Sequence, residues 1–269
     1  MQPATAPSTH NVALSRGGVQ HALDVLPVGV ERLMWRGTEL GRQLEAVQPS
    51  GWEALDRELP GGGWPTRSVT ELLTAQPAVL EWRLLGPALR SATSLGGQVV
   101  VIGPPRTPHV PGLLHEGLHE KQLVWIQAEA PAERLWVTEQ VIKSNAAGAV
   151  VAWLPQARQE QIRRLQVCAQ GFEGLVFLCR AQSAKHEASA APLRLEATVG
   201  LDWELRVHVF KRRGPAHDSH ISLASVPGGL ASVLTPRLMK PSVLLHRTEE
   251  ATHAVGLPAA ISRRQRTPA

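Results

Sequence analysis

The stretch Gly51-Trp-Glu-Ala-Leu-Asp-Arg-Glu-Leu-Pro-Gly-Gly-Gly-Trp-Pro-Thr-Arg-Ser-Val-Thr-Glu-Leu-Leu73 decides the fold of this 269-residue chain. A glycine-rich turn runs into the short apolar segment Val69–Leu73, which is typical of a buried strand. The segment that follows, Thr74–Trp82, contains no glycine, lysine or serine. A strand that leads through a loop into a helix is typical of the first unit of an α/β protein.

Apolar runs alternate with helical patterns from about residue 68 to residue 180. This rhythm predicts an α/β fold with a doubly wound, mostly parallel sheet. The later strands predict antiparallel additions at the C-terminal end of the sheet. The expected strands are Val69–Leu73, Gln98–Ile102, Gln122–Gln127, Gly148–Trp153, Gly174–Cys179, Leu193–Val199, Trp203–Lys211 and His220–Ala224. The expected helices are Pro77–Thr93, Pro108–His119, Pro131–Ser144 and Gln156–Gln170.

The composition is that of a globular protein. With 43% hydrophobic residues the chain can bury a sizeable core. No apolar run approaches the roughly 20 residues that a membrane-spanning helix needs. The first ten residues have no basic start followed by an apolar segment, so we expect no secretory signal and a cytoplasmic location. The two cysteines, Cys168 and Cys179, are too few for a disulfide framework or a cysteine-based zinc site, and we expect reduced thiols.

The sequence divides into four regions. We expect a flexible leader at 1–29, an N-terminal arm at 30–49, a core at 50–225 and a basic, disordered tail at 226–269. From residue 225 onward six basic residues stand against two acidic ones, so the tail carries +4 of the chain's net charge of +5. Such tails contact nucleic acid or acidic partners, or stay solvated. The arm either packs on the core or binds a partner. The candidate partner contacts are Trp35, Arg36, Arg263, Arg264 and Arg266.

The residues Ser50-Gly-x-x-x-Leu55-Asp56-x-x-Leu59-Pro-Gly-Gly-Gly63-x-Pro65 resemble the motif that precedes the phosphate-binding strand of RecA-type ATPases. More narrowly, the chain resembles the ImuA family, RecA-related proteins associated with bacterial translesion DNA synthesis and also described as SulA-like. The resemblance covers roughly residues 30–225 and implies a RecA-like core. Its motifs are Leu33-Met-Trp-Arg36, Leu59-Pro-Gly-Gly-Gly-Trp-Pro65, Thr70-Glu-Leu-Leu73, Leu84-Leu-x-Pro87-Ala-Leu and Val209-Phe-Lys-Arg-Arg-Gly214.

The resemblance implies a non-catalytic accessory protein in error-prone DNA synthesis and SOS damage tolerance. The implied partners are an ImuB-type polymerase homologue, an error-prone C-family DNA polymerase, RecA and DNA, which implies a nucleoid-associated protein. An SOS-type cell-division inhibitor is the alternative from another class. Binding to the tubulin-like division protein would distinguish that alternative from a role on DNA.

The nucleotide site of RecA-type proteins is degenerate in this chain. A P-loop needs glycines, a lysine and a serine or threonine. After Thr74, the lysine position falls near Leu80 and the hydroxyl position near Glu81, whose carboxylate would repel phosphate. The strand ending at Trp153 lacks the metal-binding carboxylate, and Ile102 is followed by glycine and proline instead of the activating glutamate. We expect no ATP hydrolysis and no cofactor.

A short metal motif gives a second alternative. His115-Glu116-Gly117-Leu118-His119 matches the H-E-x-x-H zinc pattern, and Glu139 lies 20 residues beyond His119. Gly117 weakens the helix on which both imidazoles would have to lie. A chance surface pair is the preferred interpretation, so we expect no metal, and a zinc hydrolase is kept as an alternative only.

Basic residues mark where nucleic acid could bind. RecA-type cores bind DNA through loops after the later central strands, which correspond to Pro155–Arg164 and Arg180–Pro192. Nothing in these loops indicates base reading, so binding should be sequence-tolerant and strongly salt-dependent. Solvated helix charge is the alternative. The candidate DNA or phosphate contacts are Arg158, Arg163, Arg164, Lys185, Lys211, Arg212 and Arg213.

Tryptophans supply the remaining candidates. Trp125 and Trp153 fall in apolar strands and are expected in the core. Trp35, Trp52 and Trp64 lie in arm or loop positions, where they either pack on the core or stack on bases or partners. Packing is the preferred interpretation for all three.

Overall fold

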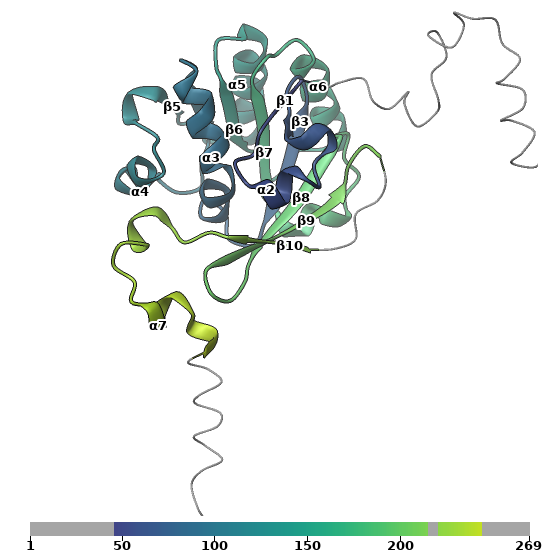
Figure 1. Ribbon diagram of the computed structural model, residues 1–269. Helices are drawn as coiled ribbons and strands as arrows, with labels where there is room; N and C mark the ends of the chain where they lie inside the picture. Colours follow the sequence, from purple (N-terminus) through teal and green to yellow (C-terminus); the bar gives the residue numbers. More distant parts are fainter. Residues whose placement is uncertain (1–45, 215–219, 244–269) are drawn as a thin grey trace, which may run out of the picture. The chain divides into compact units, whose positions relative to one another are not determined.

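The structure is a computed structural model in which residues 46–214 and 220–243 are described (Figure 1). The expected leader, most of the arm and the residues after 243 lie outside these ranges. The five candidate partner contacts, Trp35, Arg36, Arg263, Arg264 and Arg266, therefore lie outside the described residues. No helix in the described part of the chain is long and apolar enough to cross a membrane.

An eight-stranded mixed sheet forms the centre of the fold, in the order β10-β9-β8-β3-β7-β6-β4-β5. The six strands from β8 to β5 are mutually parallel, and β9 and β10 are antiparallel. This confirms an α/β fold with a mostly parallel sheet. The strands are β3 (Val69–Thr74), β4 (Val99–Ile102), β5 (Leu123–Ile126), β6 (Ala149–Trp153), β7 (Leu175–Ala181), β8 (Leu193–Val199), β9 (Glu204–Lys211) and β10 (His220–Ala224).

β8 differs from the expectation that all the later strands would be antiparallel additions. It pairs in parallel with β3, with Thr70 opposite Leu193, and within the sheet only β9 runs in the opposite direction, because it is antiparallel to both β8 and β10. β3 is therefore flanked by β7 on one side and β8 on the other. All six of its residues are buried, as the apolar run Val69–Leu73 predicts.

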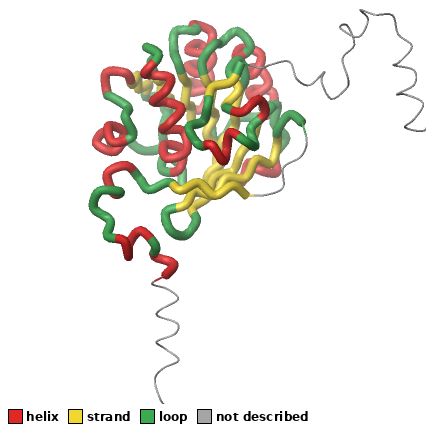
Figure 2. Tube along the Cα trace, viewed as in Figure 1, coloured by secondary structure: helices red, strands yellow, loops and turns green. Residues whose placement is uncertain are grey.

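Helices cover both faces of the sheet, as Figure 2 shows with the strands in yellow and the helices in red. The helices α3 (Leu80–Ser94) and α4 (Val110–His115) pack into one hydrophobic cluster. The helices α5 (Pro131–Ser144) and α6 (Gln159–Ala169) pack into the second, on the opposite face. The alternation of the two clusters along β4, β6 and β7 follows from the two-residue period of side chains in a sheet.

The stretch that opens the core, residues 47–65, packs compactly against the side of α3. Its short elements are β1 (Val47–Gln48), α2 (Glu53–Asp56), a 3-10 helix at Pro60–Gly62 and β2 (Trp64–Pro65), and β1 pairs with β2. Gly51 has φ +82°, and a Cβ there would lie 2.3 Å from the Cβ of Pro87. Only glycine fits this position, because its backbone is left-handed and touches α3.

Three of the four tryptophans in the described residues that were expected to pack in the core meet that expectation. Trp64 is fully buried and meets Phe177 edge to face at 5.3 Å, and Trp153 is 3% exposed. Trp52 donates its indole hydrogen bond to the carbonyl of Leu84 and packs against the core. The prediction for Trp125 is wrong. That side chain is 41% exposed because β5 is the edge strand of the sheet.

The described part of the expected tail has structure of its own. It contains a 3-10 helix at Gly228–Leu230 and the short helix α7 (Pro236–Met239). The indole of Trp203 donates a 2.8 Å hydrogen bond to the carbonyl of Leu238, and Ser242 binds Asp202 through its amide and hydroxyl. Residues 226–243 thus have short helical turns and contacts with the loop around Trp203, and the disorder expected for the tail stays a prediction.

Candidate functional site

The candidate site lies where β3 ends and α3 begins, at the carboxyl edge of the parallel strands. Open α/β sheets bind ligands at this edge. The helix was expected from Pro77 but begins at Leu80, because the chain first turns through Ala78 with φ +64°. The loop 75–79 therefore separates Thr74 from the helix, and Glu81 stands in its first turn.

Glu81 fills the space between the loop and the strand ends. Its carboxylate is 1% exposed and accepts three hydrogen bonds. The hydroxyl of Thr74 and the indole of Trp153 donate to Oε1 at 3.0 and 3.2 Å, and the amide of Val79 donates to Oε2 at 3.1 Å. A buried carboxylate is tolerated when it is fully hydrogen-bonded, and these donors satisfy it. The carboxylate of Glu81 thus forms part of the amino end of α3.

Three positions at the neighbouring strand ends, Trp153, Cys179 and Gly103, offer no group for phosphate or metal chemistry. Trp153 ends β6, and its ring lies 5.6 Å from that of Trp82. The thiol of Cys179 on β7 is fully buried, and this burial, together with the charge of Glu81, raises its pKa well above the ordinary value. After β4, a Cβ at Gly103 would lie 2.6 Å from the Nε of Arg134, so this position is closed as well.

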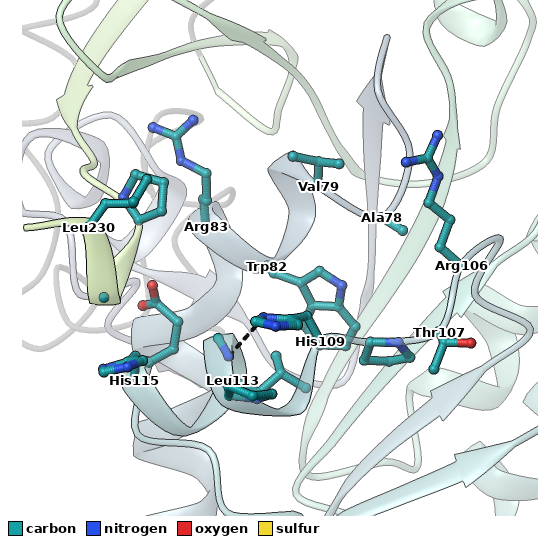
Figure 3. Close-up of a pocket in the computed structure, with 16 residues that line it drawn as sticks. Ala78, Val79, Trp82, Arg83, Arg106, Thr107, His109, Leu113, His115 and Leu230 are labelled. Carbon is teal, nitrogen blue, oxygen red and sulfur yellow. Dashed lines mark hydrogen bonds between the residues drawn. The ribbon is translucent and has the colours of Figure 1, made fainter.

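A cavity of about 570 Å³ opens beside the Glu81 site (Figure 3). Its lining comes from the loop before α3, from α3 itself, from the segment 106–116 and from residues 227–230. Trp82, His109 and Leu113 lie at its centre, and the ring Nδ1 of His109 accepts a 3.1 Å hydrogen bond from the amide of Gly112. Most of the lining is apolar, which is typical of ligand and peptide pockets.

A buried charge network was missed by sequence reasoning. Glu71, in the middle of β3, is fully buried between two arginines. Arg180 donates to its Oε1 at 2.7 Å, and Arg194 donates to its Oε2 at 2.5 Å. Arg180 also binds Glu187 at 2.6 Å, and Arg194 binds the carbonyl of Ala184 at 2.8 Å. The only signal in the sequence is the presence of charged residues inside three largely apolar strands: Glu71 in β3, Arg180 in β7, and Arg194 with Glu196 in β8.

The Glu71 network holds the loop Arg180–Pro192, one of the two loops that were expected to contact DNA. The loop forms a 3-10 helix, Gln182–His186, directly after β7. Lys185 forms an ion pair with Glu196, and the ammonium of Lys211 donates a 2.7 Å hydrogen bond to the carbonyl of Ser189. Two candidate phosphate contacts thus lie on this side of the molecule and are held by intramolecular partners.

The other candidate contacts are spread over two further places. Arg212 bonds the carboxylate and the carbonyl of Glu58, and Arg213 is exposed at the end of the same segment. Arg158, just before α6, and Arg163 on α6 are exposed, whereas Arg164 forms an ion pair with Glu139 on α5. The structure does not bring all seven basic residues to one surface.

The H-E-x-x-H motif does not lie on one helix. α4 ends at His115, Gly117 has φ +80°, and His119 precedes a separate 3-10 helix that begins at Glu120. Glu139, the matching third ligand, lies on α5 at the opposite face of the sheet and binds Lys143 and Arg164 instead. The described residues contain no group of three or more histidine, cysteine, aspartate or glutamate side chains arranged to hold a metal ion.

Comparison with known proteins gives no assignment: no family model matches the chain, and no curated protein is significantly similar to it. The relation to the ImuA family therefore stays a prediction that rests on the motif residues.

Proposed function

We propose that this chain is a non-catalytic, RecA-like accessory protein that acts as a scaffold in error-prone translesion DNA synthesis and SOS damage tolerance. Its partners would be an ImuB-type polymerase homologue, an error-prone C-family polymerase, RecA and DNA. The observation that carries the proposal is the buried carboxylate of Glu81 at the start of α3.

Glu81 opposes nucleotide binding for two physical reasons. Its negative charge lies where an incoming phosphate would approach the amino end of α3, and like charges repel. It also takes up the donors of Thr74, Val79 and Trp153, and hydrogen bonds to a charged group contribute roughly 1.5–3 kcal/mol each. A phosphate would have to displace this carboxylate without help from a P-loop lysine.

Nucleotide binding tests this first part. Calorimetric titration of the full chain with ATP and Mg²⁺ should give no binding heat, and phosphate release should equal that of buffer. The Glu81→Gln variant removes the charge and keeps one acceptor oxygen. It should remain unable to hydrolyse ATP, because the lysine and the metal-binding carboxylate are absent. Stoichiometric ATP binding by the unaltered chain would contradict the proposal.

Partner capture tests the scaffold role. The full chain and a variant with Arg263, Arg264 and Arg266 replaced by alanine are compared as baits in extracts of DNA-damaged cells. The ImuB-type and C-family polymerases should be recovered with the first bait and depleted with the second. Purified chain should also alter RecA filament growth on single-stranded DNA. Unchanged RecA filaments and strand exchange would count against this role, and binding to the tubulin-like division protein would favour the division-inhibitor alternative.

A further inference from the structure

The cavity next to Glu81 continues into an exposed apolar surface. Val79 and Leu230 line the cavity and are 41% and 38% exposed. Val110 and Leu114 of α4, next to lining residues, are 39% and 44% exposed. Large apolar side chains that gather around a cavity in this way mark a surface that another molecule covers. A small ligand inside the cavity would leave the side chains of α4 in water.

The position of Glu81 restricts what can enter. A nucleoside polyphosphate in the cavity would bring its phosphates to the loop 75–79, where the carboxylate of Glu81 already accepts the amide of Val79. An uncharged, bulky side chain meets no such repulsion, and the centre of the cavity at Trp82, His109 and Leu113 offers it an apolar contact (Figure 3). An apolar anchor on a polypeptide therefore fits both the cavity and its exposed margin.

The charges at the margin indicate what surrounds the anchor. Figure 3 shows Arg83 and Arg106 at the edge of the cavity. Arg83 donates a 2.8 Å hydrogen bond to the carbonyl of Trp203 and also bonds Ser225, so it is part of the wall. Arg106 is exposed, and Glu116 is the only carboxylate in the lining. Acidic residues beside the anchor would pair with Arg106.

We propose that this cavity docks a segment of a partner protein that inserts one bulky apolar side chain and places acidic residues against Arg106. The inference deepens the scaffold proposal, because it gives one partner site and its chemistry, and it rests on that proposal only for the identity of the partner. The binding mode is that of an anchor residue in a preformed pocket with a charged margin.

Synthetic peptides test the docking chemistry without any natural partner. Fluorescein-labelled peptides carry tryptophan, phenylalanine, leucine or alanine at the centre, with aspartate-rich, serine-rich or lysine-rich flanks. Fluorescence polarisation with the full-length chain should show binding about tenfold tighter for apolar centres than for alanine, and tighter for acidic than for basic flanks. Added salt should weaken the effect of the flanks more than that of the centre.

Two variants assign the binding to the cavity. Leu230→Glu should abolish binding of the apolar-centred peptides, whereas Leu95→Glu, at an 81% exposed position after α3, should leave it unchanged. Arg106→Glu should reverse the preference from acidic to basic flanks, and Arg206→Glu, exposed on β9, should not. Equal thermal unfolding midpoints confirm that the variants fold.

Three results would overturn this inference. The first is that no apolar-centred peptide binds with a Kd below about 1 mM. The second is an affinity that does not depend on the central residue of the peptide. The third is a preference for apolar centres that persists in Leu230→Glu. A dimer that is lost in Leu230→Glu would assign the surface to a second copy of the chain and would also overturn it. None of these outcomes depends on ATP, RecA or the polymerases, so the scaffold proposal would stand or fall separately.

Discussion

Glu71 is a carboxylate that no water reaches, placed between two guanidinium groups on neighbouring strands. Replacing it with glutamine leaves Arg194 buried without a counter-charge and Arg180 with Glu187 as its remaining charged partner, and breaking such a buried pair costs about 3–5 kcal/mol. We therefore expect Glu71→Gln to lower the free energy of unfolding by that amount in urea titrations at pH 7.

The matched control for Glu71 is Glu173→Gln. Glu173 pairs with Arg67 at the surface, where the side chains are 73% and 60% exposed. Surface pairs contribute about 0–1 kcal/mol, so this variant should unfold almost like the unaltered chain. Similar losses in both variants would mean that the buried network does not carry the stability assigned to it.

Single residues also show where the sequence was informative. The sequence predicted Glu81 near the start of a helix, and it lies in the first turn of α3, whereas the degenerate nucleotide site stays a prediction. The partners of Glu71 were not predictable, because Arg180 is 109 residues away in the sequence. The exposure of Trp125 was missed because an apolar strand does not reveal whether it lies at the centre or the edge of its sheet.

At the scale of elements, the contact between the opening turn and α3 depends on Gly51. An alanine there would have both a left-handed backbone and a Cβ 2.3 Å from Pro87. Gly51→Ala should lower the free energy of unfolding by more than about 1 kcal/mol. Gly96→Ala is the control, because Gly96 has φ +87° with no atom within 4 Å of the added Cβ. Equal losses would show that backbone strain alone, and not the contact with α3, explains the effect.

The stability that Glu139 gives to the contact between α5 and α6 should depend on pH. The hydrogen bond from Lys143, followed by that from Arg164, holds the pKa of Glu139 below its ordinary value of 4.5 although burial opposes this. A carboxyl whose pKa is lowered by folding stabilises the fold above its unfolded pKa and loses that contribution as the pH falls through its folded pKa.

Unfolding midpoints between pH 7 and pH 3 measure this effect. The unaltered chain should lose stability below about pH 4.5, and Glu139→Gln should lose less over the same interval, because its side chain does not titrate. Parallel acid profiles for the two proteins would show that Glu139 contributes nothing to the acid sensitivity.

Element boundaries show a similar division between what was predictable and what was not. Pro131 at the first turn correctly marked the start of α5, because proline suits that position. Pro77 did not mark the start of α3, since the left-handed Ala78 intervenes. Pro87 lies inside α3, although proline is disfavoured in helix interiors. It packs against Gly51 of the opening turn, a tertiary contact that the sequence pattern does not reveal.

At the scale of the whole molecule, the class of the fold was predictable and the order of the strands was not. Alternating apolar and helical segments require a covered parallel sheet. β8 lies beside β3 because the chain passes from β7 to the other side of β3 after Gln182–His186. This polar segment is short, and nothing in its sequence indicates the position or direction of the next strand. The Glu71 network spans β3, β7 and β8, so the insertion of β8 and the burial of these charges belong to one arrangement.

The distribution of charge gives the last prediction, on DNA binding. Arg158, just before α6, and Arg163 on α6 are exposed, whereas Arg164, Lys185 and Lys211 are held by partners within the chain. If α6 contacts phosphates, replacing Arg158 and Arg163 with alanine should weaken binding to single-stranded DNA of any sequence. It should also reduce the slope of log affinity against log salt by about 0.7 per lost contact.

Fluorescence anisotropy of labelled oligonucleotides over a series of KCl concentrations measures both quantities. Arg57→Ala, which removes one exposed arginine on the opening turn, controls for the loss of a single positive charge away from α6. A reduced slope only in the α6 variant would place the phosphate contacts on that helix. An unchanged slope would move them to other basic residues, such as Arg213, and no binding at low salt would remove DNA from the proposed partners while leaving the protein contacts to be tested on their own.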